Sequence, residues 1–222
     1  MEHFLIIEDH QDVFENLERK ILEKFPSAKI STASNCDFAL DFIKSKKLSD
    51  PITLLILDLT FNNNNSDTQL KDGKSLLRAL KDELMEIPTI IYSSHDELEH
   101  IYPVINNYAP KGYIIKTHNS NEDLLLCISK VLQGEYFYSQ KVNDLLYNRV
   151  KYTCRLDTVD EQIIKLLPEI DFIKDWDGKI RTSPNEFMSY TSIKKRIDTI
   201  CQELDVSNSK QLVLKLKQLG LL

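Results

Sequence analysis

Three acidic side chains stand directly after two strongly apolar segments of the chain. Glu8 and Asp9 follow the apolar run at residues 4–7, and Asp58 follows the run at residues 54–57. Parallel strands of an α/β sheet open their ligand crevice at their carboxyl ends, so we expect these carboxylates to converge. Converging carboxylates repel one another unless a cation joins them. A hard divalent cation with oxygen ligands meets that need, and the sequence therefore predicts a Mg²⁺ site.

The elements that must position these carboxylates alternate between strands and helices. Short apolar runs predict five strands, at residues 3–8, 29–33, 52–57, 89–92 and 111–115. Helical spacing of apolar side chains predicts five helices, at residues 11–25, 36–46, 74–84, 97–108 and 122–133. This alternation predicts an α/β fold with a doubly wound, five-stranded parallel sheet.

A second, mainly helical region follows the expected sheet. Gly134 is a helix stop, and the polar residues 135–155 with scattered aromatic side chains predict a linker that is partly helical. Apolar side chains at helical spacing return in three segments, at residues 158–167, 192–204 and 209–219. We therefore expect one domain over residues 1–134 and a second over residues 156–222.

The composition bounds the class of protein. With 222 residues and 42% hydrophobic content, the chain can bury a core, which excludes global disorder. The sequence has no apolar run of about 18 residues or more and no signal-peptide pattern, so we expect a cytoplasmic protein without a membrane partner. The four cysteines are far apart and form no CxxC pair, which favours neither a zinc site nor a disulfide framework.

The net charge of −6 is unevenly distributed along the chain. Residues 151–222 hold 12 Lys and Arg against 11 Asp and Glu, whereas the first 150 residues carry a net charge of −7. An acidic module followed by a locally basic one is typical of a regulatory domain joined to a DNA-contacting domain.

Residues 1–134 resemble the receiver domain of bacterial two-component response regulators, which has a flavodoxin-like fold. Such domains have an acidic pair after strand one, an aspartate after strand three, a Ser or Thr after strand four and a lysine after strand five. The chain has these residue types in that order, as Glu8, Asp9, Asp58, Ser93 and Lys116. The resemblance implies that a sensor histidine kinase phosphorylates Asp58.

The resemblance also implies how the charge of the transfer is managed. Glu8, Asp9 and Asp58 would hold Mg²⁺ together with the backbone carbonyl of Thr60. An aspartate that attacks a phosphoryl group needs its equatorial oxygens neutralised. Lys116 would supply a point charge for that purpose.

Three further residues would turn phosphorylation into a changed surface. The Ser93 hydroxyl would donate to a phosphoryl oxygen and draw its loop inward, while the small side chain of Ser94 leaves room for the donor. Tyr113 matches the aromatic position whose rotamer follows that movement.

The segment after Asp58 departs from the receiver pattern. The family has a short loop with a proline there, but residues 61–71 of this chain form a longer polar insertion, the core of which is Asn62–Lys71. The insertion either shields the acyl phosphate, selects the kinase or is a neutral surface feature, because long polar loops cost little free energy.

Residues 192–222 resemble the recognition helix and closing helix of LuxR/NarL-type helix-turn-helix regulators, and residues 156–167 resemble their first helix. The recognition helix would lie in the major groove of promoter DNA as part of a homodimer that forms in the active state. The side chains expected to contact the DNA are Ser192, Lys194, Lys195, Arg196 and Thr199.

The segment at residues 168–191 is atypical, because it is longer than the scaffold helix and turn of that family. Residues 175–179 indicate a hairpin turn. Pro184 is placed to open a short helix through Tyr190 that replaces the scaffold helix.

These features favour a response regulator in which phosphorylation of Asp58 controls DNA binding and transcription. One alternative keeps the receiver but has a degenerate output domain that acts through protein–protein interaction. Another is enzymatic, because Asp58 also resembles the nucleophile of haloacid-dehalogenase-type phosphatases. Those enzymes need a second aspartate two residues later, where this chain has Thr60, so we do not expect an enzyme.

Overall fold

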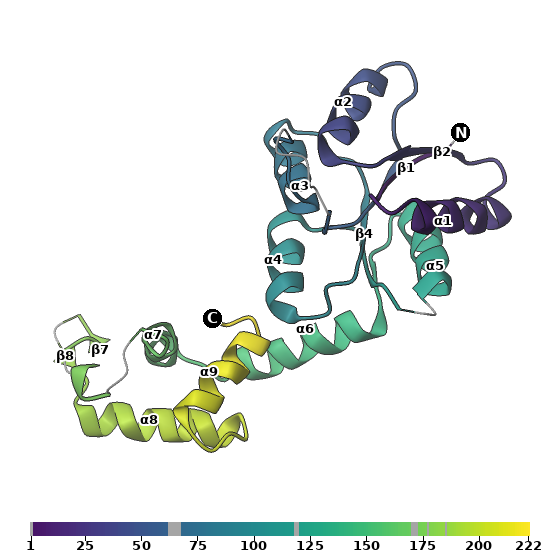
Figure 1. Ribbon diagram of the computed structural model, residues 1–222. Helices are drawn as coiled ribbons and strands as arrows, with labels where there is room; N and C mark the ends of the chain where they lie inside the picture. The colour runs from purple at the N-terminus through teal and green to yellow at the C-terminus, as the bar shows by residue number, and fades with distance from the viewer. Residues whose placement is uncertain (1, 62–67, 118–119, 170–172, 177, 185) are drawn as a thin grey trace. The chain divides into compact units, whose positions relative to one another are not determined.

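Two units, each with its own hydrophobic core, make up the computed structural model (Figure 1). The structure describes residues 2–61, 68–117, 120–169, 173–176, 178–184 and 186–222. The first unit comprises Met1–Asp96 and Pro103–Asn143, and the second comprises Glu97–Tyr102 and Asp144–Leu222. Residues 62–67 of the polar insertion lie outside the described ranges.

The sheet of the first unit is parallel throughout. Its strands are β1 (His3–Ile7), β2 (Lys29–Ala33), β3 (Leu54–Leu57), β4 (Thr89–Ser93), β5 (Gly112–Ile115) and β6 (Phe137–Tyr138). They lie in the order β2-β1-β3-β4-β5-β6. The predicted doubly wound α/β fold is confirmed, but the predicted count of five strands is wrong, since the described residues form six.

The sixth strand joins the edge of the sheet through two backbone hydrogen bonds. The Phe137 amide donates to the Lys111 carbonyl at 2.9 Å, and the Ser139 amide donates to the Tyr113 carbonyl at 2.9 Å. A strand of two residues has no side-chain periodicity of its own, which is why the sequence pattern did not indicate it.

Helices cover both faces of the sheet. They are α1 (Gln11–Lys24), α2 (Cys36–Lys46), α3 (Gly73–Asp82), α4 (Leu98–Tyr108) and α5 (Ser120–Leu132), followed by α6 (Gln140–Thr153). Helices α1 and α5 lie on one face, and α2, α3 and α4 lie on the other (Figure 1). The segment 135–155, predicted as a partly helical linker, thus consists mostly of β6 and α6.

Burial on both faces explains the continuous apolar runs of the central strands. All described residues of β1, β3, β4 and β5 are buried. Gly112 of β5 lets α5 approach closely, because a Cβ at this position would lie 2.3 Å from the Cys127 sulfur. The sheet core therefore holds the carboxyl ends of its strands in fixed positions.

The second unit is mainly helical. It contains α7 (Thr158–Leu166), the 3₁₀ helix η1 (Ile173–Trp176), β7 (Arg181–Ser183), β8 (Glu186–Phe187), α8 (Tyr190–Glu203) and α9 (Ser209–Gln218). Asp157, Ser189 and Asn208 cap the three α-helices by accepting hydrogen bonds from backbone amides. The helices predicted at 158–167, 192–204 and 209–219 are therefore confirmed, with bounds that move by one or two residues. None of the helices in the described ranges has the length and apolar character to cross a bilayer.

The segment between α7 and α8 differs from both local predictions. The hairpin turn predicted at residues 175–179 is correct only as a turn. The Lys179 amide donates to the Trp176 carbonyl at 3.0 Å and Gly178 has a φ of +73°, but the element before it is the 3₁₀ helix η1 and not a strand paired with β7. Asp177 lies outside the described residues. The helix predicted from Pro184 is wrong, because β7 pairs antiparallel with β8 there.

Hydrogen bonds from α7 and within the segment explain why it is extended. The Gln162 side chain of α7 binds both backbone groups of Arg181, with distances of 3.0 Å to the amide and to the carbonyl. The Met188 amide donates to the Ile180 carbonyl at 2.9 Å. Proline suits the connection between two strands as well as a first helical turn, so Pro184 alone could not decide between them.

Candidate functional site

The parallel register of β1 and β3 brings two acidic side chains together. Ile7 pairs with Leu57, so the residues that follow them, Glu8 and Asp58, are neighbours at the same edge of the sheet. The Asp58 amide also donates to the Ile7 carbonyl at 3.0 Å. The side chains of Glu8 and Asp58 are only 3% and 5% exposed, so their charges need compensation within the protein.

Lys116 supplies that compensation from the end of β5. Its Nζ lies 2.6 Å from Oε2 of Glu8 and 2.6 Å from Oδ2 of Asp58. Burial lowers the pKa of Lys116, but the charges and hydrogen bonds of Asp58 and Glu8 outweigh burial and raise the pKa above its ordinary value. The side chain is therefore a permanent cation at neutral pH.

The backbone around Asp58 fixes the direction of its carboxylate. Oδ1 accepts hydrogen bonds from the amides of Leu59, at 2.6 Å, and Thr60, at 3.2 Å. Gly73, the first residue of α3, packs directly against this turn, and its amide donates to the Leu59 carbonyl at 3.1 Å. A Cβ at position 73 would lie 2.3 Å from the Asp58 carbonyl oxygen, so glycine is required by close approach.

His10, which was not predicted as a site residue, contacts both Asp9 and Glu8 and so connects Asp9 to the cluster. His10 Nδ1 lies 3.1 Å from Glu8 Oε1 and 2.9 Å from Asp9 Oδ1. The hydrogen bond with Glu8 and then the charge of Asp9 raise the pKa of His10. Its place directly after the acidic pair is the one signal in the sequence that could have indicated this contact.

The donor set of the cluster fits a hard divalent cation. Lys116 contacts Glu8 and Asp58, and Asp9 adds a third carboxylate beside Glu8, so the carboxylates of the cluster outnumber its lysine. Ligand oxygens of Glu8 and Asp9 also lie within 4.8 Å of each other. Carboxylate oxygens are the ligands that Mg²⁺ prefers, so Glu8, Asp9 and Asp58 could hold this ion.

The predicted switch residues lie at the end of β4, where Ser93 is the last residue and Ser94 follows, and within β5, which contains Tyr113. Ser93 is fully buried and pairs with Ile115 across the two strands, whereas Ser94 is exposed. Tyr113 is also fully buried, and its hydroxyl has no hydrogen-bond partner among the described residues. Burial raises the pKa of Tyr113, so the phenol stays neutral.

A second histidine connects the loops that follow β3 and β4. His95 Nε2 lies 3.0 Å from the Thr60 hydroxyl. Thr60 comes two residues after Asp58, and His95 comes two residues after Ser93. The residue pattern of receiver domains has no histidine at this place, so the sequence contains no signal for this contact.

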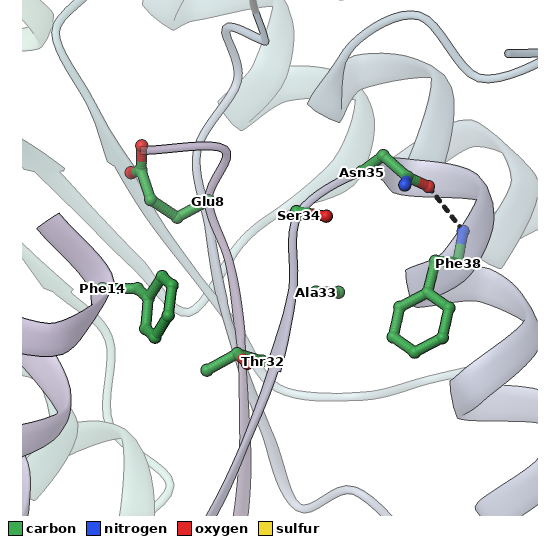
Figure 2. Close-up of a pocket in the computed structure, with 7 residues that line it drawn as sticks. All are labelled: Glu8, Phe14, Thr32, Ala33, Ser34, Asn35 and Phe38. Carbon is green, nitrogen blue, oxygen red and sulfur yellow. Dashed lines mark hydrogen bonds between the residues drawn. The ribbon is translucent and has the colours of Figure 1, made fainter. Parts of the chain in front are cut away.

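A cavity opens beside the acidic cluster (Figure 2). Its volume is about 280 Å³, with Glu8 on one side and Asn35 and Phe38 on the other. The remaining lining comes from Phe14, Thr32, Ala33 and Ser34. Asn35 fixes its far wall by accepting a hydrogen bond from the Phe38 amide at 2.8 Å. The cluster is therefore open to a small group on the side of β2.

The second unit presents the predicted DNA-contacting residues on α8. The side chains of Ser192, Lys194, Lys195 and Thr199 are exposed. Ile193, Ile197 and Ile200 of the same helix are buried in the core of the unit. The helix is therefore amphipathic, with these polar side chains outside its core-facing stripe.

The structure separates Arg196 from its two basic neighbours. Its Nη2 binds Oδ2 of Asp157, and its Nε lies 2.7 Å from Oδ1 of Asp160. Both acids belong to the N-terminus of α7, which places Arg196 at the junction of α7 and α8. Adjacent helical residues point about 100° apart, which is why a triplet in the sequence does not make one patch on the surface.

Comparisons with known proteins agree with this architecture. No protein-family model matches the chain. Oxygen regulatory protein NreC of Staphylococcus aureus is 26% identical over 159 residues, which cover 66% of this chain and 71% of that protein.

Two solved structures match almost the whole chain. An RcsB response regulator of Salmonella typhimurium matches with a TM-score of 0.70 and 19% identity, over 98% of this chain and 100% of that one. A structure of two RcsB dimers bound to DNA matches with a TM-score of 0.61 and 21% identity, over 98% of each chain. At this identity the structural matches establish the fold. Together with the sequence match, they confirm the resemblance that the sequence predicted.

Proposed function

We propose that this chain, a relative of the two-component response regulators, is a transcription regulator whose DNA binding is controlled by phosphorylation of Asp58. The observation that carries the proposal is the buried pair of Glu8 and Asp58, joined by Lys116 Nζ at 2.6 Å from each. In this proposal residues 1–134 form the receiver, 135–155 connect the two parts, and 156–222 form the output domain.

The proposed chemistry is phosphoryl transfer to a carboxylate. An oxygen of Asp58 attacks the phosphorus of a phosphohistidine on a sensor histidine kinase; the phosphorus–nitrogen bond breaks and an acyl phosphate forms. Lys116 stabilises the negative charge on the equatorial oxygens. A Mg²⁺ ion held by Glu8, Asp9, Asp58 and the Thr60 carbonyl would add to that neutralisation.

The proposed readout uses the ends of β4 and β5. The Ser93 hydroxyl donates to a phosphoryl oxygen and moves its loop, and the small exposed Ser94 leaves the donor room. Tyr113 follows that movement, and its hydroxyl, which has no partner among the described residues, loses no hydrogen bond when the ring turns. A charge added at Asp58 thereby changes the surface over these strands.

The proposed output is binding of a homodimer to promoter DNA in the cytoplasm. Support comes from the exposed lysines Lys194 and Lys195 on an amphipathic helix, with Ser192 and Thr199 available for phosphate contacts. Arg196 was predicted to contact DNA, and in the proposal it holds α8 against α7 instead. Solved structures of RcsB, which shares the fold, include dimers bound to DNA.

The test compares the wild type with Asp58→Ala after treatment with acetyl phosphate and Mg²⁺. Mass spectrometry should show one added phosphoryl group on the wild type and none on the variant. Beryllofluoride should increase dimer formation and duplex binding only in the wild type. An unmodified wild type would contradict the proposal, and multiple turnover of a phosphate monoester would replace the regulatory role with an enzymatic one.

A further inference from the structure

The hairpin formed by β7 and β8 stands where the family resemblance implied a scaffold helix. Every described residue of its two strands is exposed. Its base, in contrast, is anchored, because Ile180 and Trp176 are 0% and 1% exposed and belong to the core of the unit. The strands of the hairpin are therefore exposed to solvent, while the residues before them anchor it to the core.

Arg181 is held in place from two directions on this hairpin. The Gln162 side chain binds its backbone amide and carbonyl at 3.0 Å each. Its guanidinium lies over the exposed Phe187 ring of the paired strand, 4.9 Å from the ring centroid. Among the described residues no carboxylate forms an ion pair with Arg181. The charge of this side chain is thus positioned but not neutralised within the unit.

The hairpin leads directly into the helix proposed to contact DNA. Strand β8 ends at Phe187, and α8 begins at Tyr190 after its cap Ser189. Figure 1 shows the two strands at the start of α8. Lys194 and Lys195 follow in the first two turns of that helix and are exposed.

The charge of the hairpin and the start of α8 is mostly positive. Lys179, Arg181, Lys194 and Lys195 are exposed cations without an ion pair in the described ranges, and Glu186 is the single acid among the described residues 178–195. A local excess of positive charge beside an exposed helix complements a phosphate backbone.

We infer that the hairpin is a second DNA-contacting element, in which Arg181 binds a backbone phosphate beside the groove that α8 enters. The inference rests on the proposed function and names a contact that the family pattern does not contain. A two-stranded ribbon is narrow enough to follow a DNA groove. A planar guanidinium binds phosphate through two parallel hydrogen bonds, and Phe187 and Gln162 reduce the entropy that the contact costs.

The test measures binding of the full chain, treated with beryllofluoride and Mg²⁺, to a short labelled duplex of mixed sequence. Fluorescence anisotropy at several salt concentrations gives the affinity and its salt dependence. For Arg181→Ala we expect about 3- to 10-fold weaker binding, and a slope of log affinity against log salt that is smaller by about 1. Arg181→Lys keeps the positive charge but not the planar guanidinium, so its affinity should lie between those of the wild type and Arg181→Ala.

The matched control is Lys217→Ala, which removes one positive charge from an exposed position on α9 and should leave affinity and slope unchanged. Lys195→Ala reports on α8 in the same assay. If Arg181→Ala keeps the wild-type affinity and slope while Lys195→Ala is weakened, the hairpin inference is overturned and the proposed function stands. If the wild type itself shows no salt-dependent binding, the proposed function fails and the hairpin contact fails with it.

Discussion

At the scale of single residues, Lys116 decides whether the acidic cluster is stable. Two carboxylates that are almost fully buried share its ammonium, at 2.6 Å each. Removing the partner of a buried charge costs more than the net value of the pair, because the remaining charge loses its compensation. The sequence predicted that Glu8, Asp58 and Lys116 would lie at the same edge of the sheet. Only the structure shows that the Lys116 ammonium contacts both acids at once.

We predict that Lys116→Met lowers the free energy of unfolding by about 3 kcal/mol in the absence of divalent cations, as measured by urea denaturation. Lys116→Arg keeps the charge and should lose much less. Adding Mg²⁺ should stabilise Lys116→Met more than the wild type, because the ion then replaces the missing charge. Equal stability of Lys116→Met and the wild type would contradict this account.

The sign of the pKa shift fixes the pH range of that difference. The folded protein raises the pKa of Lys116, so its stabilising contribution is fully present below the ordinary lysine pKa of about 10.4. The contribution is lost only as the pH rises through the raised value. Deprotonation of Lys116 should therefore cost the wild type no stability between about pH 7 and 9, and urea denaturation of the wild type at these two pH values measures it.

Arg196 illustrates the opposite outcome for a residue predicted from a basic triplet. It pairs with Asp157 and Asp160 and is about one third exposed, so solvent screening reduces the value of both ion pairs. We predict that Arg196→Ala destabilises the second unit by about 1 kcal/mol in thermal unfolding. DNA affinity should fall less than for Lys195→Ala at a temperature where both variants are folded. A larger loss of DNA affinity for Arg196→Ala than for Lys195→Ala would indicate that Arg196 contacts the DNA directly.

At the scale of elements, the parts that could be predicted from the sequence are those with a recognisable side-chain pattern. Strands β1 and β3 are continuous apolar runs, and the amphipathic helices repeat apolar side chains at helical spacing. The two strands carry Glu8 and Asp58 to one edge of the sheet. Strand β6 is too short to show any pattern. The hairpin of β7 and β8 depends on Gln162, nearly twenty residues away in the sequence, and His95 reaches Thr60 across two loops.

The start of α3 gives a prediction at this scale. We expect Gly73→Ala to push α3 away from the turn after β3, because the added Cβ would lie 2.3 Å from the Asp58 carbonyl and 2.9 Å from the Leu59 Cα. Such overpacking should cost about 1–3 kcal/mol of stability and slow phosphorylation by acetyl phosphate. Lys74→Ala at the next position is the control. Unchanged stability and rate in Gly73→Ala would show that α3 can shift freely.

At the scale of the whole molecule, the chain combines two separate hydrophobic cores. The first core contains Ile56 of β3, and the second contains Ile197 of α8. No sequence pattern gives the exact boundary between the units, because α6 continues as regular structure through the segment where a linker was expected.

We predict that core truncations act locally. Ile56→Ala should lower the unfolding transition of the first unit, and Ile197→Ala that of the second, each by about 2–4 kcal/mol, because both side chains are almost fully buried. Calorimetry with hydrogen exchange assigns each transition to its unit. Loss of protection throughout the chain in either variant would show that the two cores unfold as one.

The hydrogen bond between His95 and Thr60 adds a threshold to the proposed signal. If Ser93 moves toward a phosphorylated Asp58, this hydrogen bond must either break or move the loop after β3 together with the loop after β4. Part of the free energy of phosphorylation, on the order of 1 kcal/mol for one hydrogen bond, is then spent on releasing it. Replacing His95 by a residue whose side chain forms no hydrogen bond should therefore increase the population of the active conformation in the unphosphorylated protein.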